Sequence, residues 1–66
     1  MKVTELTRDE LIELKQRYLM EQREEAHEDE PSYGELSAID ELVTDEEVYQ
    51  EYADVDFVEE DFFGNI

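Results

Sequence analysis

The side chains best able to do chemistry in this chain are carboxylates, because Asp and Glu make up 22 of its 66 residues. Lys and Arg contribute 5 residues, cysteine is absent, and His27 is the one histidine. Two carboxylates can act as general acid and general base, but only where a cleft sets their pKa values apart. A chain this short buries too little surface to enclose such a cleft. The composition therefore predicts a protein that is not an enzyme.

The aliphatic hydroxyl side chains offer no activated nucleophile. Nucleophilic catalysis needs a Ser, Thr or Cys beside a general base, and the sequence has no Cys and one His. Thr7, Ser32 and Thr44 each precede a Glu by three residues, a spacing typical of residues that cap helix N-termini. The two other hydroxyl residues of this kind are Thr4 and Ser37. We therefore expect no catalytic residues.

Carboxylates could also bind a metal ion, so the spacing of the acids matters. The best match to an EF-hand loop begins at Asp54 and Asp56, but Val58 occupies the third ligand position and no central Gly follows. Runs of adjacent acids would attract divalent cations only as counterions; they are Glu28–Glu30, Asp45–Glu47 and Glu59–Asp61. We expect His27, beside the first run, to be a solvated loop residue. The sequence predicts no metal site and no cofactor.

The charges are distributed unevenly along the chain, whose formal net charge is −17. Residues 1–23 are neutral because they hold five acids and all five basic residues, and residues 24–66 hold the other 17 acids with no Lys or Arg. Ordinary soluble surfaces mix both signs, and such asymmetry usually marks an interaction surface. A surface this acidic would repel nucleic acid, whose binding needs Lys and Arg. We expect the partner to be a basic protein surface.

A protein with this charge density can imitate nucleic acid. Duplex DNA carries about one negative charge per 1.7 Å of its axis, so 17 charges correspond to roughly 29 Å. A compact domain of this length has a diameter of about 28 Å. Carboxylates on helices would supply the fixed array that occupies the groove of a nucleic-acid-binding enzyme. The predicted partner-binding residues are Glu35, Asp40, Glu41, Asp45, Glu46, Glu47, Glu51, Asp54 and Asp56.

In length and charge the chain resembles the DNA-mimic inhibitors made by phages and mobile elements, such as anti-restriction and anti-CRISPR proteins. This resemblance implies an inhibitor that competes with nucleic acid, and it rests on composition rather than on a shared motif. Two segments, Glu13–Leu19 (ELKQRYL) and Pro31–Leu36 (PSYGEL), are similar to segments of short acidic bacterial proteins without an assigned activity. That similarity transfers no function and no site residues.

An adaptor is the alternative to a DNA mimic. Aromatic residues lie among acids near the end of the chain, a mixture typical of segments that fold on a partner protein; they are Tyr49, Tyr52, Phe57, Phe62 and Phe63. Phe57, Phe62 and Phe63 would be the partner contacts, unless these aromatics simply form the core. A homodimer through the neutral segment 1–23 is a further alternative, because like charges oppose association elsewhere. Without a signal peptide or an apolar span, we expect a cytoplasmic protein that binds no membrane.

Three helix starts must position these carboxylates. Each has a capping Ser or Thr and a Glu three residues later; the pairs are Thr7 with Glu10, Ser32 with Glu35, and Thr44 with Glu47. The apolar spacing that follows predicts helices over residues 8–25, 33–42 and 45–53. Pro31 favours an extended residue before it and so separates the first two helices. Asp56 with Glu59 could start a last short turn.

The sequence thus predicts an all-α fold in which residues 1–66 form one small three-helix domain. One long N-terminal helix is packed by two short helices, and an irregular aromatic segment ends the chain. The expected core consists of apolar and aromatic residues at helical spacing, namely Leu11, Leu14, Tyr18, Leu36, Ile39, Leu42, Val48 and Tyr52.

Overall fold

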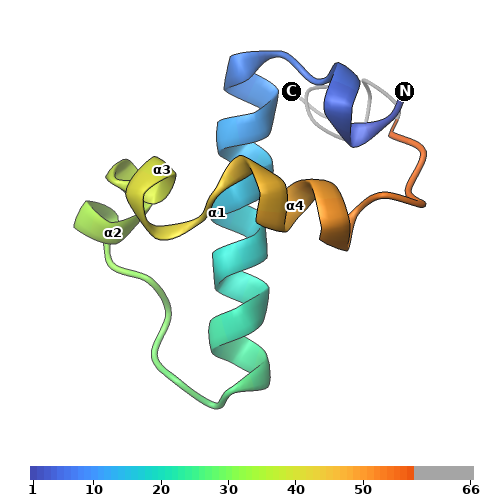
Figure 1. Cartoon of the computed structure of the whole chain (residues 1–66). Helices are drawn as coiled ribbons and strands as arrows, with labels where there is room; N and C mark the ends of the chain where they lie inside the picture. Colours follow the sequence, from blue (N-terminus) through green and yellow to red (C-terminus); the bar gives the residue numbers. More distant parts are fainter. Residues whose placement is uncertain (58–66) are drawn as a thin grey trace.

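The computed structural model describes residues 1–57, and these residues fold into helices joined by short connections (Figure 1). The elements in chain order are the 3-10 helix η1 (Val3–Glu5) and the α-helices α1 (Arg8–Glu25), α2 (Tyr33–Ser37), α3 (Ile39–Leu42) and α4 (Asp45–Glu51). No strand occurs in this part of the chain. The prediction of an all-α fold with one long N-terminal helix packed by shorter ones is confirmed.

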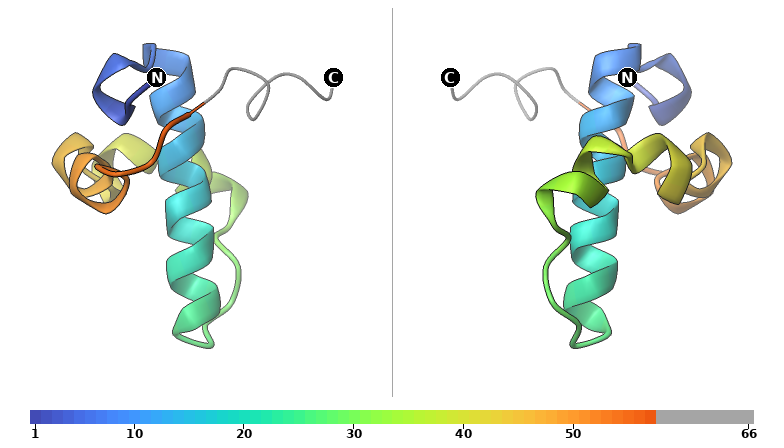
Figure 2. Two further views of the ribbon diagram at one scale, coloured as in Figure 1. Left: turned by 90° about the vertical axis from the view of Figure 1, so that its right-hand side faces the viewer. Right: turned by 90° about the vertical axis from the view of Figure 1, so that its left-hand side faces the viewer.

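The long helix α1 is the element on which the others are assembled. Helices α3 and α4 both pack on α1, α2 packs on α3, and η1 packs on α4. Figures 1 and 2 show α4 crossing α1 near its N-terminal half, while the loop after α1 runs back along it toward α2. The resulting globule has a Cα radius of gyration of 11.9 Å and extents of 31 × 28 × 20 Å.

Helix α1 has the predicted bounds because both of its ends are satisfied locally. At the start, the Glu10 amide donates to Thr7 Oγ1 (3.3 Å) and the Thr7 amide donates to Glu10 Oε1 (2.8 Å). At the end, the His27 amide donates to the Glu24 carbonyl (3.1 Å) and the Glu28 amide to the Arg23 carbonyl. This is the Schellman pattern, in which the residue after the C-cap turns left-handed. That residue is His27, with φ of 57°.

The other two predicted caps are also present. The Ser32 side chain accepts from the Glu35 amide (3.2 Å), and the Thr44 side chain accepts from the Glu47 amide (3.2 Å). Each Glu carboxylate accepts in return from the amide of its capping residue. Short helices such as α2 and α4 are marginal by themselves, so these reciprocal bonds fix where each helix begins.

The predicted second helix, residues 33–42, is divided in the structure. Ala38 adopts φ −99° and ψ 27° and separates α2 from α3. The Ala38 amide donates to the carbonyls of both Gly34 and Glu35, and this tighter last turn of the helix ends α2. The division follows from tertiary packing, because α2 is tied to α1 by polar contacts while α3 turns its apolar side into the core. The predicted third helix ends at Glu51 rather than at residue 53.

The core is smaller than predicted and partly different. It consists of Val3, Leu11, Leu14, Ile39, Val43, Val48 and Phe57. Tyr18 and Tyr52 are half-buried against it, as are Leu6, Ile12, Leu19 and Tyr49. The placement of Leu42 in the core was wrong, since its side chain is 47% exposed. Leu36 is half-buried and lies outside the core cluster.

The error at Leu42 has a structural cause. Helix α3 ends there, and Val43 takes up an extended conformation with φ −130° and ψ 122°. This turn of the backbone directs Val43 inward (2% exposed) in place of Leu42. Val3 and Phe57 complete the core from the two ends of the described chain, where the Phe57 amide donates to the Met1 carbonyl (2.7 Å).

Replacing His27 with Gly should stabilise the protein by about 0.5–1 kcal/mol, because Gly adopts a positive φ without steric cost. His27→Ala is the matched control, since it removes the imidazole but keeps the Cβ atom. Urea unfolding of both variants measures the difference. Equal stability of the two variants would show that the left-handed conformation at this position carries no cost.

Leu14→Ala should lower the free energy of unfolding by about 2–5 kcal/mol, because it opens a cavity in the core. A core this small supplies only about 3–5 kcal/mol in total, so we expect a largely unfolded chain by circular dichroism. Leu42→Ala makes the same chemical change on a half-exposed side chain and should cost less than about 1 kcal/mol. Similar losses for the two variants would contradict the observed core.

Candidate protein-binding surface

A buried lysine joins the three main helices. Lys15 of α1 is 2% exposed, and its Nζ atom donates to Asp40 Oδ1 of α3 (2.8 Å) and pairs with Asp45 of α4. The two aspartates lie on either side of the corner formed by Val43 and Thr44. One ammonium group therefore holds α3 and α4 against α1 at once.

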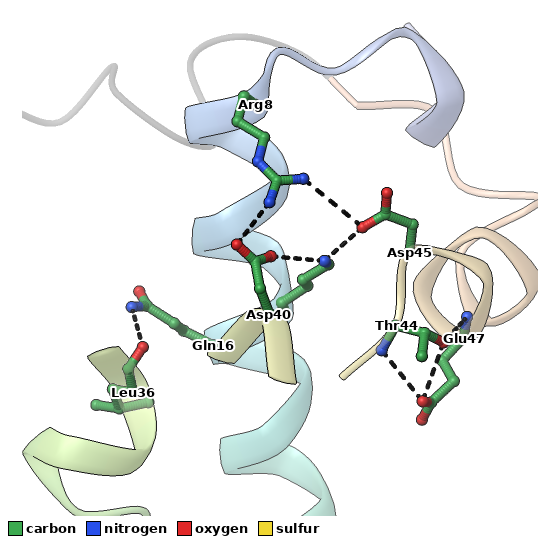
Figure 3. A network of polar contacts seen from close by, with 8 residues as sticks. Arg8, Gln16, Leu36, Asp40, Thr44, Asp45 and Glu47 are labelled. Carbon is green, nitrogen blue, oxygen red and sulfur yellow. Dashed lines mark hydrogen bonds and ion pairs between the residues drawn. The ribbon is translucent and has the colours of Figure 1, made fainter. Parts of the chain in front are cut away.

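Arg8 supports the same two carboxylates from the solvent side. Its Nη2 atom donates to Asp40 Oδ2 (2.6 Å), and its Nη1 atom lies 4.0 Å from Asp45 Oδ1. Arg8 and Lys15 are seven residues apart, about two helical turns, and so project from the same side of α1. Figure 3 shows Arg8 beside Asp40 and Asp45, the two carboxylates that also pair with Lys15. We call Arg8, Lys15, Asp40 and Asp45 the Lys15 cluster.

The electrostatics of the Lys15 cluster favour its charged form. Burial lowers the pKa of Lys15, but hydrogen bonds to Asp40 and Asp45 outweigh that effect and the pKa is raised overall. The hydrogen bond from Lys15 lowers the pKa of the Asp40 carboxyl, and the charges of Lys15 and Arg8 lower it further. Both pKa shifts therefore favour the charged forms of Lys15 and Asp40.

Polar contacts also fix α2. Gln16 Nε2 donates to the Leu36 carbonyl (3.0 Å), and Arg23 pairs with Glu35. The pKa of Glu35 is lowered first by the hydrogen bond from the Ser32 backbone and then by the hydrogen bond from Arg23. Three of the five basic residues, Arg8, Lys15 and Arg23, are thus engaged with acids of the following helices.

These contacts divide the nine acids predicted to bind a partner. Four have internal cations: Asp40 and Asp45 in the Lys15 cluster, Glu35 with Arg23, and Asp56 with the terminal amine of Met1. The hydrogen bond from that amine lowers the pKa of Asp56. Glu47 caps α4. The remaining four are exposed; they are Glu41, Glu46, Glu51 and Asp54.

Helix α4 presents acids on its outer side. Its inner side holds Val48, which is fully buried, and Tyr49, which packs against the core. By helical periodicity Glu47 lies opposite this inner side, with Glu46 on one flank and Glu51 on the other, and all three are exposed. We call these three residues the acidic ridge. Glu47 and Glu51 are four residues apart, so their repulsion costs the helix a few tenths of a kcal/mol.

The aromatic residues considered as partner contacts have different positions. Phe57 is 6% exposed, and its ring meets the edge of Tyr52 at a centroid distance of 6.0 Å. Tyr52 in turn meets Tyr18 at 6.4 Å, and burial together with the charge of Glu21 raises the pKa of Tyr52 to about 12. Phe57 is therefore a core residue. Phe62 and Phe63 lie outside the described residues.

Sequence reasoning missed two side chains. Lys15 was counted only as a basic residue of the first helix, although it lies four residues after Leu11 and next to Leu14, on the buried side. That spacing could have indicated its burial. Tyr33, the first residue of the predicted helix 33–42, has a side chain that is 87% exposed. It lies in the first turn of the short helix α2, where residues 1–57 leave it uncovered.

No other feature of residues 1–57 resembles a reactive site. A hollow of about 310 Å³ is lined by Met20, Glu24, Glu28 and Glu30. It contains no nucleophile beside a base. Within the described chain no group of three or more His, Cys, Asp and Glu side chains is placed to hold a metal ion. None of these helices combines the length and apolar character needed to cross a membrane.

Lys15→Met should cost about 1–2 kcal/mol of unfolding free energy, because the two aspartates lose their buried cation but keep Arg8 and are exposed enough to regain water. Lys15→Ala should cost about 1–3 kcal/mol more, since it also removes the buried alkyl stem. Urea unfolding separates the charge effect from the packing effect. Equal losses for the two variants would mean that the stem contributes nothing.

Acid should weaken the Lys15 cluster. Asp40 has a lower pKa in the folded state than in the unfolded chain, so its contribution to stability is complete above the unfolded pKa and is lost as the pH falls through the folded value. The stability difference between the wild type and Asp40→Asn should therefore be largest near neutral pH. It should shrink as the pH falls below 3.8, the ordinary pKa of Asp, and on through the lower folded pKa. Thermal unfolding at a series of pH values measures it, and a constant difference would contradict the pairing.

Comparison with known proteins identified no similar protein. No family model, no curated protein and no solved structure matches the chain.

Proposed function

We propose that this protein binds a basic site on another protein, and that it does so as a DNA-mimic inhibitor of a nucleic-acid-binding protein. The observation that carries the proposal is the acidic ridge. It lies on a helix fixed to the core, and residues 24–57 contain no Lys or Arg to neutralise it. An array of carboxylates held on a folded scaffold can present charge at set positions, as a phosphate backbone does.

The internal ion pairs do not reduce the net charge available to a partner. Ion pairing within the molecule leaves its formal net charge of −17 unchanged. Three of the five basic residues, Arg8, Lys15 and Arg23, face the acids of α2, α3 and α4. The described residues 1–57 hold 19 of the acids and all 5 basic residues, and their net charge of −14 corresponds to roughly 24 Å of duplex at about one charge per 1.7 Å, which fits within the longest extent of 31 Å.

The expected mode of action is competition. A basic groove that binds duplex DNA would meet carboxylates in place of phosphates, and electrostatic steering would speed the encounter. Such an inhibitor needs no catalytic step and no cofactor, and we place it in the cytoplasm with its targets. The apolar stripe of α1 is occupied by α3 and α4, so a homodimer through α1 would have to use its polar side.

An adaptor remains the second candidate, favoured by the exposure of Tyr33. An aromatic side chain that is 87% exposed beside acidic residues could enter a pocket of a specific partner. The adaptor would bind through this aromatic contact and would not be displaced by nucleic acid.

Charge reversal of the acidic ridge tests the proposal. Glu46→Lys with Glu51→Lys should abolish capture of the target from host lysate, while Glu47 is kept because it caps α4. Excess duplex DNA should displace the target from the wild-type protein. Leu14→Asp is the control that tests whether the acids must be held in a fixed array. It keeps every acid of the wild type but should unfold the chain. We expect this variant to capture the target poorly.

Three results would contradict the proposal. Capture that persists in excess duplex DNA would favour the adaptor, and Tyr33→Ala would then be the variant to examine. Equal capture by the unfolded Leu14→Asp variant would show that net charge suffices without a fixed array. Undiminished capture by the charge-reversed protein would remove the acidic ridge from the interface.

A further inference from the structure

We infer that Lys15 is a positioning residue for the acidic ridge, so that a basic residue with no access to the partner sets the geometry of an acidic binding surface. The inference rests on the proposed function, because it concerns the same surface. Lys15 is 2% exposed and cannot itself touch a partner. It acts through Asp40 and Asp45, which it holds on either side of the corner between α3 and α4.

Apolar packing and a capping box also act at this corner, since Val43 is buried and the Thr44 side chain accepts from the Glu47 amide. Helix α3 has four residues, and Val43 is extended. The apolar anchors on either side are Ile39 and Val48, both buried. Asp45 is the first residue of α4, so its bond to Lys15 ties the start of the helix that carries the acidic ridge to α1. Removing the ammonium would leave the exposed Arg8 as the one cation that the structure shows beside the two carboxylates, and its Nη1 atom lies 4.0 Å from Asp45.

Burial of a charged group at this position is not explained by stability alone. Replacing buried ion pairs with apolar residues of similar volume is often neutral or stabilising. A fixed orientation of α4 is a benefit that an apolar residue would not supply, because dispersion contacts lack the direction of hydrogen bonds. Holding a binding surface in its bound geometry also improves affinity by lowering the entropy lost on association.

The variant Lys15→Met distinguishes a positioning role of Lys15 from a purely electrostatic one. Loss of positioning should weaken binding to a partner, whereas loss of the positive charge should strengthen binding to a polycation. It makes the protein more negative by one charge and should therefore bind a flexible polycation at least as well as the wild type does. It frees the corner, so binding to a partner that needs a fixed array should weaken. A merely electrostatic role for Lys15 would move both affinities in the same direction.

The experiment compares two probes under conditions in which circular dichroism shows each variant to be folded. The first probe is the protein captured by the wild type from host lysate, and the second is poly-L-lysine. For Lys15→Met we expect about tenfold weaker binding to the captured protein and no loss of binding to poly-L-lysine. Faster hydrogen exchange at the Val43 and Glu47 amides should accompany the loss.

A second pair of variants keeps the test valid if Lys15→Met does not fold. Asp40→Asn breaks the Lys15 cluster from the acidic side, and Asp29→Asn removes the same charge from an exposed loop residue. Asp40→Asn should weaken binding to the captured protein several-fold more than Asp29→Asn does. Equal effects of the two, or unchanged affinity of Lys15→Met for the captured protein, would overturn the positioning role.

These outcomes are separate from a failure of the proposed function. If duplex DNA does not displace the captured protein, the DNA-mimic proposal fails. The affinity ratios of the same variants for that protein still decide whether Lys15 positions the binding surface.

Discussion

The ion pairs of Lys15 with Asp40 and Asp45 are the interaction on which the assembly of the helices depends. They connect α1 to α3 and to α4 through one buried ammonium group. Burying a charge is costly unless it is paired and hydrogen-bonded, and both conditions are met here. The pairing also places Asp40 and Asp45 beside a positive charge that attracts them. This matters because the net charge of −17 opposes compaction of the chain.

The rest of the architecture limits the same repulsion by using acids locally. Glu10, Glu35 and Glu47 close the capping boxes of their helices, where negative charge is favourable near the helix N-terminus. Glu35 also pairs with Arg23. The acids left over lie on outer surfaces, among them the acidic ridge of α4. In an ordinary domain such outer acids would have no further role. In our proposal they are the residues that bind the basic partner.

The folding of the N-terminal helix could be predicted residue by residue, because its signals are local. Thr7 and Glu10 define its start, the apolar spacing of Leu11 and Leu14 defines its inner side, and both ends agree with the structure. The starts of α2 and α4 were predicted for the same reason. The division of the second helix at Ala38 was not, because the backbone there responds to contacts with α1 that are distant in sequence.

The candidate site was predicted only as a set of acids. The sequence by itself determined that the part of the chain after residue 23 is acidic, because residues 24–66 contain no Lys or Arg to neutralise their acids. Tertiary structure decided which acids remain available to a partner: Asp40 and Asp45 meet Lys15 only because the chain folds back over α1, whereas Glu46 and Glu51 face outward. It also decided that Phe57 belongs to the core and Leu42 does not. Sequence specifies charge and helical periodicity, but an ion pair between distant residues exists only once packing has brought them together.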